Sequence, residues 1–198
     1  SLFLLSSPSV FADDISDFSI EGMSIGDSLL DYMTEEEILK EIEENKDYYL
    51  NLKEPYKYLE VYSFKDFQSF SSLAFLIENI PTSKYITNKS NKSNKYIILS
   101  IRWLIGFTED FNGCIEKRDE IAEDLSKVFP NAKKSEGNYV DNYDNTIIDG
   151  VYFKFDSGAE SKVVCLDYEE TVRIKNNWKD NLSIAIQYEE IIKWLQDD

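Results

Sequence analysis

Alternation of apolar and polar residues in several short segments restricts this chain to a sheet-rich fold. The most apolar segment, 96–105, places five large side chains on one face: Ile97, Leu99, Ile101, Trp103 and Ile105. A period of two residues is typical of a strand with one buried face. Similar patterns predict further strands over 58–64, 70–80, 147–155, 161–168 and 182–188, with a helix left open for 70–80.

Other segments have apolar residues or capping residues at spacings that are typical of helices. Apolar residues recur every three or four positions over 111–129, and Pro130 ends that helix. Thr34 and Glu37 occupy the N-cap and N3 positions of a capping box, which predicts a helix from residue 35 onward. Ser24 is predicted to be the N-cap of a short helix over 26–33. A closing helix is predicted over 191–195.

The predicted order is helices, three strands, a helix, three strands and a closing helix. This order predicts an α+β fold, with a mainly antiparallel sheet and helices packed on one face. It also suggests two αβββ halves, 13–107 and 108–198, within one domain spanning 13–198. The polar segment 131–145 is interpreted as a loop.

The first twelve residues, SLFLLSSPSVFA, are typical of the end of a secretory signal peptide. An apolar run precedes Pro8, and Val10-Phe11-Ala12 fits the small-residue cleavage rule. A buried N-terminal strand is the alternative. We therefore expect export, with a periplasmic or secreted mature chain that begins near Asp13.

The net charge of the chain argues against two classes of partner, nucleic acid and anionic membranes. The chain carries 38 acidic and 21 basic residues, for a net charge of −17. Nucleic acid and anionic membranes would be repelled by such a chain, so neither is expected as the main partner. After residue 12 no apolar run is long enough to span a bilayer. An envelope protein or a small ligand remains as the expected partner, and no cofactor is indicated.

The chain contains two cysteines, Cys114 in a predicted helix and Cys165 in a predicted strand. A disulfide between them fits an exported protein. It would close a loop of about 50 residues, which the chain-entropy model values at roughly 4 kcal/mol. Two separate buried thiols are the alternative. In a chain without histidine, two thiols make a poor zinc site.

The run Gly26-Asp27-Ser28-Leu29 resembles the first block of the GDSL esterases and lipases, in which the serine is the nucleophile and a C-terminal histidine its base. A serine hydroxyl is a poor nucleophile unless a neighbouring base takes its proton. This chain has no histidine, so the last block of that family has no counterpart here. We therefore predict that the chain is not an enzyme, and a hydrolase using Ser28 is the alternative.

Acidic residues in and after the polar segment offer oxygens to calcium. The candidates are Asp141, Asp144 and Asp149. Their spacing does not match an EF-hand loop, and the distal glutamate of that motif is absent. A flexible acidic loop is therefore favoured, with a calcium-dependent interaction protein as a further alternative.

The run Glu21–Tyr32 (EGMSIGDSLLDY) is similar to the opening of small exported proteins of AT-rich marine bacteria. The segment 129–133 (FPNAK), the strand that begins at Cys165 and the closing Lys193-Trp194-Leu195 match that group too. No activity is assigned to the group, so the resemblance implies none.

The Gly-Met-Ser helix start, followed by strands, also resembles the SmpA/BamE envelope lipoproteins and the β-lactamase-inhibitor-like fold. The cysteine that carries the lipid in those lipoproteins is missing here. Together these features predict a non-enzymatic exported module for binding or envelope assembly. Its partner or ligand would use an exposed sheet face or the aromatic-rich segment 48–62.

Overall fold

The computed structural model describes residue 15 and residues 18–20, 22–63, 72–79, 95–107, 110–141 and 144–196. The predicted signal-peptide remnant, 1–12, lies outside these segments. The helices are η2 (Leu29–Asp31, a 3-10 helix), α1 (Glu35–Asn45), α2 (Phe111–Val128), α3 (Glu170–Asn176) and α4 (Glu189–Leu195). The strands are β1 (Tyr58–Ser63), β2 (Ser72–Glu78), β3 (Ile98–Gly106), β4 (Lys133–Val140), β5 (Ile147–Lys154), β6 (Glu160–Asp167) and β7 (Asn181–Gln187).

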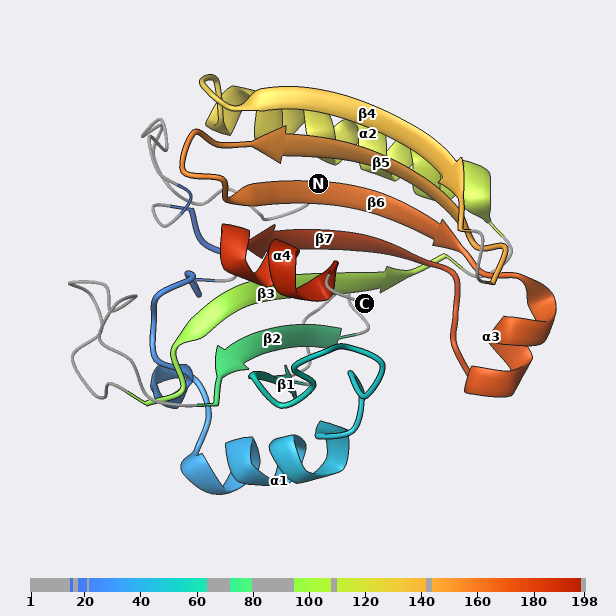
Figure 1. Cartoon of the computed structure of the whole chain (residues 1–198). Coiled ribbons are helices and arrows are strands. Elements are labelled where there is room, and N and C mark those ends of the chain that lie inside the picture. The colour runs from blue at the N-terminus through green and yellow to red at the C-terminus, as the bar shows by residue number, and fades with distance from the viewer. Residues whose placement is uncertain are drawn as a thin grey trace.

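The strands form one antiparallel sheet in the order β1-β2-β3-β7-β6-β5-β4 (Figure 1). Two meanders, β1–β3 and β4–β6, are joined by β7, which pairs with β3 on one side and β6 on the other. The predicted α+β class is confirmed. The predicted second triplet of strands corresponds to β5, β6 and β7. The structure adds β4 between α2 and β5, and it adds the helix α3 between β6 and β7. No helix in the described segments is both long enough and apolar enough to cross a membrane.

Different helices cover the two faces of the sheet. Phe75 of β2 belongs to the main core, which also contains residues of α2. Leu76 points the other way, because successive residues of a strand face opposite sides, and it packs with Ile191 and Trp194 of α4. We call these sides the α2 face and the α4 face (Figure 1). The predicted placement of helices on one face therefore does not hold for α4.

The strand β4 corrects the interpretation of 131–145 as a loop. Nearly all of its residues are exposed, so no apolar alternation marks it in the sequence. Its backbone pairs with β5 from Lys133 opposite Lys154 to Val140 opposite Ile147. Backbone hydrogen bonding at the edge of the sheet, rather than burial of side chains, therefore accounts for this strand.

The start of the first predicted helix also differs from the prediction. The 3-10 helix η2 takes the place of a helix over 26–33, and its N-cap is Ser28 rather than Ser24. Gly26 has a φ of +88°, so the backbone turns there instead of continuing a helix. The capping box of α1 is confirmed, with Thr34 and Glu37 each bonded to the other's backbone N–H.

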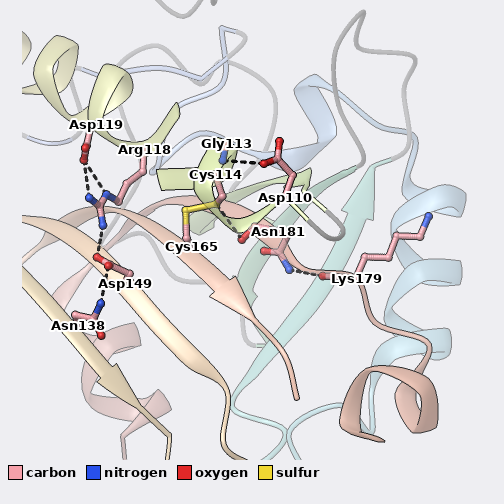
Figure 2. Close-up of a disulfide and its surroundings, with 10 residues drawn as sticks. All are labelled: Asp110, Gly113, Cys114, Arg118, Asp119, Asn138, Asp149, Cys165, Lys179 and Asn181. Atoms are coloured by element: carbon pink, nitrogen blue, oxygen red, sulfur yellow. Dashed lines mark hydrogen bonds and ion pairs between the residues drawn. A yellow bond between two sulfur atoms is a disulfide. The ribbon is translucent and has the colours of Figure 1, made fainter. Parts of the chain in front are cut away.

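A disulfide joins Cys114 of α2 to Cys165 of β6 (Figure 2). One helical turn further on, Arg118 of α2 forms an ion pair with Asp149 of β5. These two links, one covalent and one electrostatic, fix α2 over the second meander.

Reduction of this disulfide is expected to lower the free energy of unfolding by roughly 4 kcal/mol, because the bond closes a loop across a sequence separation of 51 residues. Urea unfolding of the oxidised and reduced protein measures the difference. The double variant C114A/C165A is the control, since reductant should leave its midpoint unchanged. Equal midpoints for oxidised and reduced wild type would contradict the expectation.

Candidate functional site

The predicted nucleophile Ser28 is buried and engaged in local structure. Its side chain is 0% exposed. Its hydroxyl donates to the carbonyl of Lys95 at 2.8 Å and accepts from the N–H of Leu30 at 3.3 Å. The neighbouring carboxylate of Asp27 accepts from the phenol of Tyr32 at 2.7 Å. This geometry makes Ser28 the cap of η2.

The variant Ser28→Ala should lower stability by about 1 kcal/mol through loss of the cap, and leave any hydrolysis of p-nitrophenyl acetate unchanged. Thr34→Ala is a matched control, because it removes a cap elsewhere. Urea unfolding and an ester assay measure the two effects. A hydrolysis rate that falls in Ser28→Ala alone would revive the hydrolase alternative.

Two of the three predicted calcium ligands have separate side-chain partners, and the third, Asp141, pairs through its backbone with Thr146 and Asn145. Asp149 pairs with Arg118 and accepts from the amide of Asn138 at 2.7 Å (Figure 2). Asp144 accepts from the N–H of Thr146 at 3.0 Å. Among the described residues, no three acidic, histidine or cysteine side chains gather where they could hold a metal ion. The calcium hypothesis therefore has no ligand cluster in this part of the chain.

A pocket of about 290 Å³ opens on the α4 face of the sheet. Its floor comes from β2, β3, β6 and β7, which contribute Ser72, Arg102, Leu104, Gly106, Leu166, Asn181 and Ser183. Two walls rise from opposite sides of this floor, one containing Tyr48 and Tyr62, the other Tyr168 and residues 177–179. The pocket thus joins segments that lie far apart in the sequence.

The first wall is held in place by α4. The indole N–H of Trp194 donates to the carbonyl of Glu54 at 2.9 Å. The same ring meets Tyr49 edge-on, with 4.8 Å between centroids. Tyr49 in turn packs edge-on against Tyr48 at 5.0 Å. This chain of aromatic contacts, each favourable in that geometry, brings Tyr48 to the pocket.

The second wall depends on the turn after α3. Asn177 adopts a left-handed conformation and ends the helix. The next residue, Trp178, packs against Tyr168 with ring centroids 5.1 Å apart. Asp180 supports this wall from behind, since it accepts from the N–H of Tyr168 at 2.9 Å and lies 3.5 Å from Arg173.

An ion pair between Arg102 of β3 and Glu60 of β1 lies at the pocket floor. The side chain of Arg102 is 31% exposed, whereas that of Glu60 is 1% exposed. Burial raises the pKa of the Glu60 carboxyl, while Arg102 and hydrogen bonds from Tyr49 and Tyr62 oppose the rise. The guanidinium of Arg102 is therefore accessible from the pocket, whereas the carboxylate of Glu60 is buried.

The remaining polar side chains of the pocket are hydroxyls and amides, which both donate and accept hydrogen bonds, together with one lysine. Burial raises the pKa of the phenols of Tyr48, Tyr62 and Tyr168. All three therefore stay protonated at neutral pH. Among the described residues, the lining also includes Lys179 and no acidic residue. The arrangement suits recognition of a ligand through aromatic contact and donated hydrogen bonds.

Sequence reasoning found one side of this site and missed the rest. The segment 48–62 supplies Tyr48 and Tyr62, as expected for a binding segment. Arg102 was not among the candidate site residues. A charged residue inside the most apolar strand was nevertheless a signal, because buried charges require partners. Nothing local in the sequence indicates that Glu60 is that partner.

Comparison with known proteins gives the pocket no precedent. No protein-family model, curated protein or solved structure matches this chain. Its function is therefore inferred from its own residues.

The variant Arg102→Gln should be less stable than wild type by about 3 kcal/mol near pH 8, because it leaves Glu60 buried without a cation. Loss of Arg102 raises the pKa of Glu60 further. The folded state then keeps a proton that the unfolded state releases, so stability is lost as pH rises from about 5 to about 8. Urea unfolding at both pH values measures this slope.

The double variant E60Q/R102Q is the control for this experiment, since it removes both charges. Its stability should change less with pH than that of Arg102→Gln, because no carboxyl remains at position 60 to bind a proton. If Arg102→Gln and the double variant change in parallel with pH, Glu60 is not the group responsible.

Proposed function

We propose that this chain is a non-enzymatic exported binding module whose ligand site is the pocket on the α4 face. The observation that carries the proposal is the convergence of Tyr48, Arg102 and Trp178 from three distant segments on one concave site. Small-molecule sites are usually concave and largely preformed, with aromatic walls and a few polar groups that orient the ligand. The pocket has each of these properties.

The energetics of the floor support this proposal. A buried ion pair contributes little to net stability, because the cost of removing both charges from water offsets their attraction. Apolar residues in place of Glu60 and Arg102 would pack the same volume without that cost. A charge pair that opens onto an aromatic pocket is therefore better explained by recognition than by stability.

Export is supported by two independent features. The disulfide between Cys114 and Cys165 is of the kind that persists in oxidising compartments. The first twelve residues are typical of a secretory leader. We infer a periplasmic or secreted location, where the ligand would be a small molecule of that compartment. Envelope assembly is the alternative role, with a segment of a partner protein in the same pocket.

Two exposed tyrosines give a matched test of the site. Tyr48 is 48% exposed and lines the pocket, whereas Tyr56 is 49% exposed and does not. Tyr48→Ala should lose ligand and Tyr56→Ala should retain it, because only the first removes a wall. Native mass spectrometry, after incubation with a fractionated small-molecule extract, identifies the retained mass.

Equal retention by the two variants would place binding elsewhere on the protein. Retention of no mass by wild type, together with protection of Tyr48 and Trp178 from chemical labelling by an envelope extract, would favour the assembly role instead.

A further inference from the structure

We propose that the pocket binds a small organic anion, a carboxylate on a body of about one ring, with Arg102 contacting the carboxylate. This inference rests on the proposed binding role of the pocket and adds the charge and size of its ligand. It follows from the lining residues, from the orientation of the ion pair and from the volume.

The lining differs from the rest of the chain in charge. Acidic residues are 38 of the 198 in the sequence, against 21 basic ones. The described part of the lining reverses this bias, because it contains Arg102 and Lys179 and no acidic residue. An anion repelled by the overall charge at long range would therefore meet two cationic side chains among the described residues of the pocket. Screening by salt limits that repulsion to about 10 Å.

Arg102, the positive partner of the ion pair, lines the pocket, whereas Glu60 does not. Glu60 is almost fully buried and Arg102 is one-third exposed, so the guanidinium is the more accessible charge of the pair. Glu60 holds the guanidinium in place, and the exposed part remains available to a ligand. A guanidinium can donate two parallel hydrogen bonds to a carboxylate, which gives both strength and orientation.

A second cation lies in the same cross-strand row. Ala185 of β7 pairs with Arg102 on one side and with Lys162 of β6 on the other. Burial and the like charge of Arg102 lower the pKa of Lys162, and Glu160 opposes this. The small side chain of Ala185 is the only one between the two cations in that row. Lys162 is not among the described residues that line the pocket, so this row places a second basic residue near Arg102 without adding to the lining.

The aromatic walls alone would also suit a cation. Tyrosine and tryptophan rings bind quaternary ammonium groups through their π faces. Arg102 and Lys179 oppose a cation here, because the part of the lining that the structure describes supplies no carboxylate to balance it. The volume of about 290 Å³ lies at the lower end of ligand pockets, which limits the body to about one ring.

The test compares benzoate, benzamide and benzylammonium, which share a ring and differ in charge. Trp178 is the fluorescent reporter, since it is 38% exposed, whereas Trp103 and Trp194 are 1% and 4% exposed. We expect benzoate to bind roughly tenfold or more tightly than benzamide, because only benzoate makes charge-assisted hydrogen bonds. Benzylammonium should bind most weakly.

Two sets of variants locate the effect. E60Q/R102Q should remove the preference for benzoate without leaving a buried charge unpaired. Lys179→Ala should weaken benzoate binding, and Lys175→Ala, an exposed lysine of α3 outside the pocket, should leave it unchanged. Circular dichroism and urea unfolding confirm that each variant is folded.

Three results would overturn the anion inference: benzamide or benzylammonium binding as tightly as benzoate, a preference for benzoate that survives in E60Q/R102Q, or no benzoate binding up to about 10 mM. These three results concern the charge of the ligand. The proposed binding role of the pocket is tested separately, by comparing Tyr48→Ala with Tyr56→Ala. A neutral ligand lost only in Tyr48→Ala would keep the binding role and reject the anion. Benzoate binding that is equal in those two variants would reject the pocket.

Discussion

The pairing of β7 with β3 and β6 holds the sheet together, because it is the only connection by hydrogen-bonded strands between the two meanders described here. Leu182, Ile184 and Ile186 of β7 are at most 1% exposed and belong to the main core. Without β7, β3 and β6 would each present an unpaired edge lined by apolar residues, which favours aggregation. The centre of the sheet is therefore completed by a strand from late in the sequence.

The candidate site depends on the same strand. The residues before β7 form one wall, since α3 leads through Asn177 to Trp178. The residues after it support the other wall, since α4 places Trp194 against the carbonyl of Glu54. Ser183 of β7 lies on the floor between them. The position of β7 between β3 and β6 thus links both walls and the floor, so the pocket depends on the centre of the sheet.

The elements that could be predicted are those that bury an apolar face. The helix α2 follows its periodicity, and Thr34 and Glu37 indicate the start of α1. The strand β3 was identified by its apolar character, but its predicted single apolar face is divided: Ile97 and Leu99 lie in the core of the α4 face, and Ile101 and Trp103 lie in the main core, because the register with β2 shifts beside Leu99. The strand β4 and the helix α3 were missed for one physical reason: neither buries a continuous apolar stripe. The cap at Ser28 was misplaced, because both Ser24 and Ser28 are good capping residues and only the turn at Gly26 selects between them.

The candidate site was less predictable, because its residues come together only through strand register. Glu60 meets Arg102 across β2, which lies between their strands. The sequence separates these two residues by a segment of ordinary polar and apolar character, and no local motif connects them. Tyr48 and Tyr62, by contrast, belong to one aromatic-rich segment and could be proposed together.

Comparison of two ion pairs shows why the pocket, rather than α2, is the place to seek a ligand. Asp149, the partner of Arg118 beside the disulfide, also accepts from Asn138, and Arg118 also bonds Asp119 (Figure 2). These contacts satisfy the charges, and the disulfide accounts for their position. On the α4 face, one carboxylate oxygen of Glu60 is buried without a hydrogen-bond partner among the described residues.

Such unsatisfied buried groups are rare in folded proteins and require an explanation. The side chain of Arg102 is buried enough to hold Glu60 and exposed enough to meet a ligand. A buried polar atom without a partner also occurs elsewhere in the described sheet, at Ser161 of β6, but the Glu60–Arg102 pair is charged and lies beside the aromatic walls. The proposed binding role of Arg102 would account for a charged pair in that place.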